Sequence, residues 1–226
     1  MSLSDSIETT LQRNRKKTMK KHTILAAALL FILSSASSTH GQSVTLGDAT
    51  FDATSDQTSP SWHLPMLNGV KNTFIGYGDR EGLTKTEQFS LGETIAGVKT
   101  VRRHIEGSSP AVPTEDWWLA AGTNDDLRVL KLVRAGSVVF EASAGVTPPV
   151  FFPGTPADGK TWDLFGATMT IEVVALSFSG ARLKVTQTQT LGLSAGLSAT
   201  CDYYHAGSGL MLTETRSSSS GWRRQQ

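Results

Sequence analysis

The chain has 226 residues, of which 18% are charged, and this length suffices for one domain or two small ones. Its 21 glycines, with abundant Ser and Thr, favour an all-β protein with many turns and argue against a helical bundle. A formal net charge of +1, without a clustered basic surface, gives no indication of a nucleic-acid or anionic-membrane partner.

Residues 1–41 have the order of a secretory signal peptide, which forms an N-terminal signal helix. A basic stretch from Met19 to His22 precedes an uninterrupted apolar run from Ile24 to Leu33, and small residues follow. The run is too short to span a bilayer. Residues 1–18 lie upstream of a better start at Met19, and are either a misplaced start or a long basic region. We therefore expect a secreted or periplasmic protein, with a buried helix or an anchor as the alternative.

Cleavage near Ala36, Ser38 or Gly41 would change the charge of the chain. Six of the 21 basic residues and two of the 20 acidic ones lie before Gln42, so 15 basic and 18 acidic residues remain, a net charge of −3. No Cys lies just after the apolar run, where cleavage is expected, so we expect neither a lipid-modified N-terminus nor a stable membrane anchor after cleavage. The single cysteine, Cys201, forms no internal disulfide, and its place in a predicted strand indicates a buried, inert thiol.

Short strands separated by Gly-rich turns account for residues 42–143, the first predicted β half. A short strand containing Val44 and Leu46 is followed by a loop. Further strands are predicted at 73–78, 84–91, 98–105 and 115–120, and a hairpin at 127–134 and 137–142.

The second predicted β half covers residues 144–216 and begins at the boundary segment Ala144–Pro149. An apolar segment at 150–152 is bracketed by prolines and cannot be a central strand at its ends. Apolar residues alternate from 168 to 178 but change parity at Val173-Val174, which predicts a β-bulge. Residues 217–226 are rich in Ser, and we expect a disordered tail despite Trp222. Gly or Pro interrupts every candidate helix after residue 41.

Two motifs recur in the same order in both halves. Segments 68–78 and 158–166 each read turn-Gly, Lys, then Thr-aromatic-x-x-aromatic-Gly, and segments 116–122 and 202–209 each begin acid-aromatic-aromatic-x-Ala. The repeat predicts duplicated halves, each a curved antiparallel meander of four to six strands. The two similar sheets would form a sandwich, or join edge to edge as an open half-barrel around a shared groove.

The paired aromatics of the second motif are the candidate ligand-binding residues: Trp117, Trp118, Tyr203 and Tyr204. Neighbours in a strand point to opposite faces, so one of each pair should lie in the core. The other would lie on the second face, where an exposed aromatic often marks a binding site. The alternative is that all four are packing residues.

The segment Asp202-Tyr203-Tyr204-His205-Ala206-Gly207-Ser208-Gly209-Leu210 resembles the Tyr-Tyr-x-x-Gly-x-Gly-Leu closing hairpin of uncharacterised secreted bacterial β-proteins. Asp158-Gly159-Lys160-Thr161-Trp162 resembles their Gly-x-x-Trp opening strand. The resemblance implies a curved-sheet architecture similar to that of envelope lipoprotein carriers, and it implies no particular activity or site residue.

No set of residues indicates catalysis, a metal or a cofactor. Residues 192–196 match G-x-S-x-G, but a strand is predicted after them and the later His205 is too close, which favours a Gly/Ser turn. His63, His104 and His205 lack the spacing of metal ligands. Asp116, Asp125 and Asp126 lack the pattern of a calcium loop.

The leading hypothesis is a secreted or periplasmic non-enzymatic β-protein that binds an apolar or glycan ligand, or an envelope protein, through an aromatic-lined groove. One alternative is an extracellular hydrolase with a dispersed carboxylate site, for which the candidate acids are Glu87, Glu93, Glu115 and Asp163. A second alternative is a structural surface-interaction module without a small ligand.

Overall fold

The computed structural model describes residues 42–53, 66–110, 112–176, 181–190, 197–215 and 220–225. The predicted signal peptide and the G-x-S-x-G segment lie outside these ranges. Within them the chain is all-β and antiparallel, as predicted, with one 3₁₀ turn, η1 (Gly78–Arg80). No described helix has the length and apolar character needed to cross a membrane. Residues Gly41–Gln226 form one compact unit.

Two antiparallel meanders follow each other along the chain, each with six described strands. The predicted halves had other bounds: residues 42–143 also contain a two-stranded hairpin, and the last strand lies beyond residue 216. The first meander consists of β3 (Lys71–Tyr77), β4 (Thr84–Leu91), β5 (Val101–Gly107), β6 (Glu115–Ala121), β7 (Leu127–Arg134) and β8 (Ser137–Glu141). The second consists of β10 (Thr161–Leu164), β11 (Ala167–Leu176), β12 (Ala181–Thr190), β13 (Leu197–His205), β14 (Gly209–Thr215) and β15 (Gly221–Arg224).

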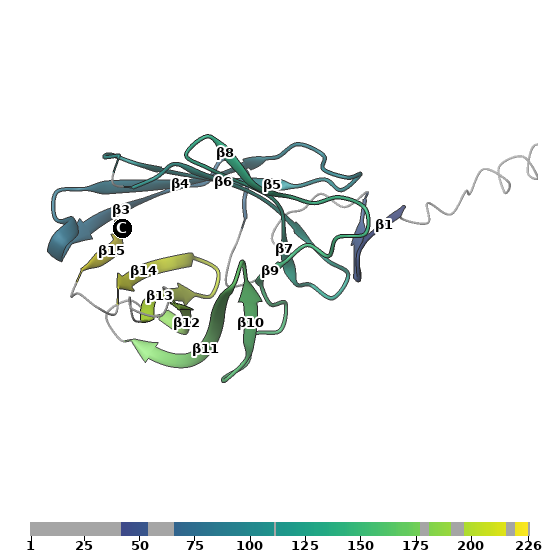
Figure 1. Cartoon of the computed structure of the whole chain (residues 1–226). Coiled ribbons are helices and arrows are strands. Elements are labelled where there is room, and N and C mark those ends of the chain that lie inside the picture. The colour runs from purple at the N-terminus through teal and green to yellow at the C-terminus, as the bar shows by residue number, and fades with distance from the viewer. Residues whose placement is uncertain are drawn as a thin grey trace, which may run out of the picture. The chain divides into compact units, whose positions relative to one another are not determined.

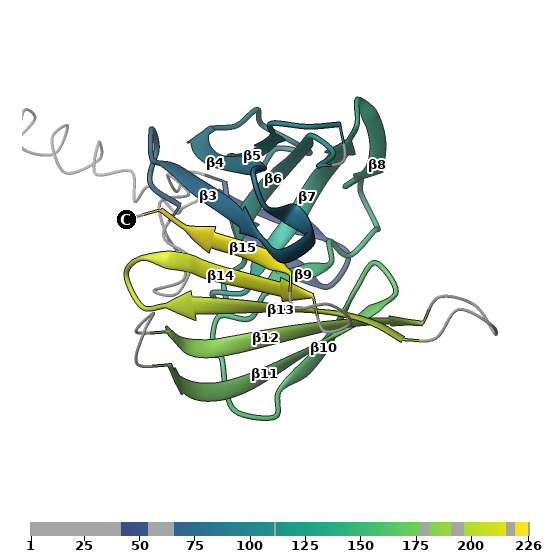
Figure 2. The same ribbon diagram turned by 90° about the vertical axis from the view of Figure 1, so that its left-hand side faces the viewer.

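The meanders share one continuous sheet instead of forming two separate ones. The last strand of the second meander, β15, pairs with the first strand of the first meander, β3, from Gly221↔Tyr77 to Arg224↔Phe74. Figure 2 shows the resulting path from β11 through β15 into β3. A thirteenth strand, β9 (Val150–Phe152), pairs only with β7, in keeping with its flanking prolines.

The predicted disordered tail is wrong for residues 220–225. Gly221–Arg224 form β15, which is hydrogen-bonded on both sides, to β14 and to β3. Trp222 is 2% exposed and belongs to the main core. The Ser-rich composition hid a strand of four residues, because so short a segment has no room to display an alternating pattern.

The sheet bends so that the two meanders face each other. In Figure 1 the strands β4, β5, β6 and β8 lie in the upper layer, and β11 to β14 lie in the lower one. Their facing sides, here called the concave face, carry the main core, with side chains such as Phe74, Phe89, Ile171 and Trp222. The opposite, convex face is covered at β6 and β7 by the hairpin of β1 (Ser43–Leu46) and β2 (Ala49–Asp52). The sequence predicts a loop after the first of these strands, but residues 49–52 form the second strand of the hairpin.

Two local features follow the predictions from the sequence. The pairing of β11 with β12 shifts register between Val173 and Leu176, which confirms the predicted bulge. The β7–β8 hairpin turns at Ala135-Gly136, and both residues have positive φ angles, as a tight two-residue hairpin turn requires. Leu91, by contrast, shares the parity of buried Phe89 but is 67% exposed at the end of β4.

The repeat is visible in the strand order, but its alignment shifts by one residue. In each meander the pairing of the fourth strand with the fifth contains one register shift. Between β6 and β7 the shift lies between the pairs Trp118↔Lys131 and Leu119↔Val129. Between β13 and β14 it lies between the pairs Tyr203↔Leu212 and Tyr204↔Leu210. Trp118 therefore corresponds to Tyr203, and Leu119 to Tyr204. The alignment predicted from the sequence, which matched Trp118 with Tyr204, puts residues from opposite faces together.

Candidate functional site

A cavity of about 300 Å³ lies on the concave face between the two meanders. Side chains of both meanders and of β9 line it, so neither half forms it alone. The lining residues are Lys85, Arg103, Ile105, Glu115, Trp117, Arg134, Phe151, Phe152, Leu164, Phe165, Ala167, Met169, Val185, Gln187, Thr200, Asp202, Tyr204, Leu210 and Thr213.

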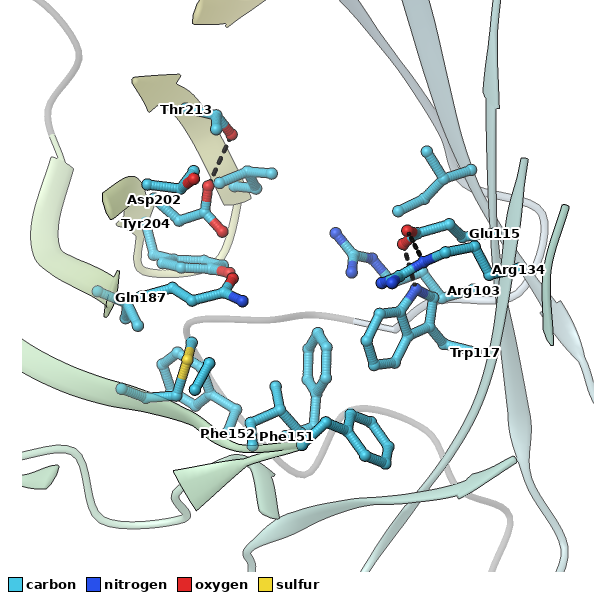
Figure 3. Close-up of a pocket in the computed structure, with 18 of the residues that line it drawn as sticks. Arg103, Glu115, Trp117, Arg134, Phe151, Phe152, Gln187, Asp202, Tyr204 and Thr213 are labelled. Atoms are coloured by element: carbon cyan, nitrogen blue, oxygen red, sulfur yellow. Dashed lines mark hydrogen bonds and ion pairs between the residues drawn. The ribbon is translucent and has the colours of Figure 1, made fainter. Parts of the chain in front are cut away.

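The polar side chains are gathered in two groups that face each other across the cavity (Figure 3). Arg103, Glu115 and Arg134 lie on one side, together with the indole of Trp117. The other side carries Gln187, Asp202, Tyr204 and Thr213. Phe151 and Phe152 lie between the two groups and form an aromatic floor. We call these the arginine wall, the aspartate wall and the floor.

Ion pairs within the first meander hold the arginine wall in place. The Glu115 carboxylate accepts hydrogen bonds from Trp117 Nε1 at 3.0 Å and from Arg134 Nε at 2.8 Å. The ring of Trp117 is in edge contact with Phe151 at a centroid distance of 5.3 Å. Glu115 and Trp117 share the concave face because they are two residues apart in β6.

Arg103 is anchored from behind by a second acid. Its Nε donates to Glu87 Oε1 at 2.6 Å, and Asn72 Nδ2 donates to Glu87 Oε2 at 3.1 Å. Burial by itself raises the pKa of Glu87, but the charge of Arg103 and the two hydrogen bonds outweigh it, so the pKa is lowered. All three residues are buried, with Glu87 only 2% exposed.

The aspartate wall contains acidic groups that are hard to ionise. Asp202 accepts a hydrogen bond from Thr213 Oγ1 at 2.7 Å. Burial raises the pKa of Asp202, against the opposing charge of Lys85. Burial also raises the pKa of the Tyr204 hydroxyl well above its ordinary value, and the neighbouring Asp202 adds to this effect.

Lys85 enters the cavity from β4 beside two aromatic rings. Its Nζ lies 5.0 Å from the ring centroid of Phe74 and 5.4 Å from that of Trp222, close enough for cation–π attraction. Burial lowers the pKa of Lys85, and Asp202 only partly offsets this. No carboxylate of the described residues lies within ion-pair distance of its Nζ.

The four aromatic candidates divide between the two faces of the sheet. Trp117 and Tyr204, from different meanders, both line the cavity. Trp118 and Tyr203 lie on the convex face. There Trp118 lies between Arg102 and Lys131, whose charged groups are 5.7 and 5.2 Å from its ring centroid. The Tyr203 hydroxyl donates to Glu214 at 2.9 Å, and its ring packs with Cys201, which is buried as predicted.

The acids named for a dispersed hydrolase site do not converge in the structure. Glu87 pairs with Arg103, and Glu93 accepts from Lys131 Nζ at 2.9 Å on the convex side. Asp163 accepts from the backbone N–H of Gly166 at 3.1 Å and caps a turn. Of the four acids only Glu115 lines the cavity, opposite Asp202.

The histidines also lie apart wherever the structure describes them. His104 Nδ1 is 2.7 Å from Asp116 Oδ1 on the convex face, whereas His63 lies outside the described residues. His205 has a buried Nδ1 with no hydrogen-bond partner among the described residues. In the described ranges no three His, Cys, Asp or Glu residues are grouped closely enough to hold a metal ion.

Several cavity residues were not identified from the sequence, although the positions of Arg103 and Lys85 in their strands are unusual for charged residues. Arg103 has the same parity in its strand as Val101 and Ile105, so it is a charged residue on an apolar face. Lys85 and Glu87 likewise share the parity of buried Phe89. A charged residue in a core-facing position requires a partner or a function. Phe151 and Phe152 gave no such signal, because an apolar segment is equally compatible with plain packing.

Comparison of the chain with protein-family models, with curated proteins and with solved structures gives no significant match.

Proposed function

We propose that this is an exported, non-enzymatic binding protein whose concave cavity holds one sugar unit of a glycan. The observation that carries the proposal is the arrangement of two polar walls over an aromatic floor. A sugar ring has hydroxyl groups around its edge and apolar C–H groups on its faces. The walls offer donors and acceptors to the edge, and Trp117, Phe151 and Tyr204 offer flat surfaces to the faces.

The size of the cavity supports a small ligand. Ligand sites in proteins usually measure roughly 300–1,000 Å³, and this cavity of about 300 Å³ is at the lower limit. A sugar ring fits such a volume, whereas a diacyl lipid does not. The envelope-carrier architecture suggested by the sequence therefore need not imply a lipid cargo.

An apolar ligand is a poorer fit because of the charged side chains in the walls. A purely apolar molecule would remove water from Lys85, Arg103 and Asp202 without replacing the lost hydrogen bonds. Leaving buried polar groups unpaired is costly, by about 1–3 kcal/mol each in proteins. A polyhydroxylated ring satisfies the same groups.

Hydrolysis is the competing function at this cavity, since Glu115 and Asp202 face each other across it. A glycosidase needs one free carboxylate as nucleophile or base and one protonated acid. Both oxygens of the Glu115 carboxylate already accept hydrogen bonds, from Trp117 and from Arg134, so Glu115 is not a free carboxylate. If the protein hydrolysed a bound glycoside, and if both Glu115→Gln and Asp202→Asn abolished this hydrolysis, the function would be catalysis and not binding alone.

A pair of neighbouring tyrosines provides the test of the proposed function. Tyr204→Phe removes a hydroxyl from the cavity, and Tyr203→Phe removes one from the convex face. Isothermal titration of the mature protein against a panel of monosaccharides and short glycans should detect binding. Tyr204→Phe should weaken that binding by about two- to tenfold, the effect of one hydrogen bond, and Tyr203→Phe should leave it unchanged. Absence of binding to the whole panel, or equal losses in both variants, would refute the proposal.

A further inference from the structure

We infer that the sugar unit carries an acidic group, a carboxylate or a phosphate, which is bound by Lys85 and Arg103. This inference rests on the proposed function and specifies the class of its ligand. It follows from which cavity charges are already neutralised by neighbouring side chains and which remain available to a ligand.

The pair Arg134–Glu115 is neutral as a unit. The Arg134 Nε and Glu115 Oε1 atoms are 2.8 Å apart, and the second Glu115 oxygen is taken by Trp117. This pair supplies the arginine wall with polarity but with no net charge.

Arg103 is neutralised by Glu87, but only part of its guanidinium is used. The bond to Glu87 goes through Nε, and this leaves the two terminal nitrogens, each a hydrogen-bond donor, for the cavity. Its guanidinium carbon lies 5.4 Å from the ring centroid of Phe151, which places the charge next to the floor. A carboxylate or phosphate matches such a pair of donors better than a single hydroxyl does.

Lys85 provides the cavity's cation that lacks an ion pair. Its surroundings are the rings of Phe74 and Trp222. Two acids, Asp202 and Glu87, and two cations, Arg103 and Arg80, act on it with opposing effects, and among the described residues no carboxylate is within ion-pair distance of its Nζ. Burying an ammonium group without a counter-ion is unfavourable, and an anionic ligand would supply the missing charge.

Asp202 is the remaining cavity acid, and when ionised it opposes the binding of an anion. It accepts the Thr213 hydroxyl at 2.7 Å, and burial raises its pKa, so it takes up a proton more readily than an ordinary carboxyl. The donors left free in the cavity, on Lys85 and on the terminal nitrogens of Arg103, thus form a site for an acidic group.

The experiment uses sugars that share one ring and differ in charge. Glucose, glucuronate, glucose 6-phosphate and glucosamine are titrated into the mature wild-type protein and into two isosteric charge variants, Lys85→Met and Asp202→Asn. Lys184→Met, which removes a lysine paired with Glu172 on the outside of the sheet, is the matched control. Thermal melting of each variant verifies that it is folded.

We expect one of the two acidic sugars to bind about tenfold or more tightly than glucose, the effect of a charge-assisted hydrogen bond. Lys85→Met should abolish most of this advantage, so that it weakens binding of the acidic sugar more than it weakens binding of glucose. Asp202→Asn should tighten binding of the acidic sugar, because it removes a negative charge from the cavity. Which of glucuronate and glucose 6-phosphate binds better decides between carboxylate and phosphate.

Three results would contradict the inference, and they differ in what else they overturn. Equal affinities for glucose and both acidic sugars would refute the acidic ligand but leave the sugar site intact. Preferential binding of glucosamine, lost in Asp202→Asn, would mean that the cavity selects a cation. Failure of all four sugars to bind, together with the glycan panel, would remove the proposed function itself.

Discussion

At the scale of single residues, the concave face contains two acids, Glu87 and Asp202, whose surroundings differ sharply although both lie near the same cations. Glu87 is bonded to Arg103 and Asn72, and these contacts lower its pKa despite burial. Asp202 has a hydroxyl partner, Thr213, and no cation within ion-pair distance among the described residues, so burial prevails and raises its pKa. The first acid stabilises the fold as an anion, whereas the second is destabilising when ionised.

The two acids should therefore give the folded protein opposite responses to pH. For Glu87 the folded pKa lies below the unfolded value of about 4.3, so its stabilisation is present above that pH and is lost as the pH falls. For Asp202 the folded pKa lies above the unfolded value of about 3.9, so stability is lost as the pH rises past that point.

Urea denaturation at pH values from about 3 to about 8, which begin below the ordinary pKa values of both carboxyl groups, should separate the two effects. At neutral pH, Glu87→Gln should lower the free energy of unfolding by about 3–5 kcal/mol, since it leaves Arg103 buried without its partner. Asp202→Asn should raise the free energy of unfolding at neutral pH. This stabilisation should disappear at the lowest pH values, where Asp202 of the wild type is protonated in both the folded and the unfolded state. Glu172→Gln, which breaks the exposed pair with Lys184, should change the free energy of unfolding by less than about 1 kcal/mol. The expectation fails if both cavity variants shift stability in the same direction.

At the scale of elements, the sequence predicts strands well where they alternate and poorly where they are short. The β7–β8 hairpin and the bulge in β11 were both expected, because turn residues and parity changes are local signals. The strand β15 was missed, because its four residues follow a Ser-rich segment and one of its two pairing partners, β3, lies far away in sequence. Long-range pairing leaves no mark on the local pattern.

The short strand β15 is expected to be essential for stability because it joins the meanders. Trp222 places its ring in the main core at 2% exposure, with the charged groups of Lys85 and Arg80 close to its face. Trp222→Ala should lower the free energy of unfolding by about 3–5 kcal/mol in equilibrium denaturation. Leu67→Ala, at a site 50% exposed, should change it by no more than about 0.5 kcal/mol. A Trp222→Ala protein as stable as the wild type would show that β15 is not part of the cooperative fold.

At the scale of the whole compact unit, the sequence predicts two curved meanders but leaves open how they combine. The structure combines them through the β15–β3 pairing into one bent sheet, and the bend brings Trp117 of β6 and Tyr204 of β13 to one cavity. Those two aromatics were among the predicted binding residues. Lys85, Arg103 and Phe152 were not, because a cavity between meanders depends on the bend and no single strand reveals it.

The bend also determines how a ligand reaches the cavity. The two edge strands of the sheet are β8 and β10, and they are not paired with each other by backbone hydrogen bonds. Aromatic side chains connect these edges instead. The ring centroid of Phe165, in the turn after β10, lies 5.5 Å from that of Phe140 and 6.2 Å from that of Trp117. Phe165 lines the cavity and is also 38% exposed, so it lies where the cavity meets the solvent. Ring contacts of this kind open more readily than paired strands do.

Phe165→Ala should therefore act on the rates of binding more than on affinity. Removal of the ring widens the access to the cavity, so association and dissociation of a bound sugar should both accelerate roughly threefold or more, since a required opening step slows binding. The dissociation constant should change less, because both rates change in the same direction. Stopped-flow or NMR exchange measurements on Phe165→Ala test this, with Val173→Ala, an exposed apolar residue on β11 at 58% exposure, as the control. If Phe165→Ala weakened binding through dissociation alone, the ring would be a contact of the ligand, and the access to the cavity would lie elsewhere on the concave face.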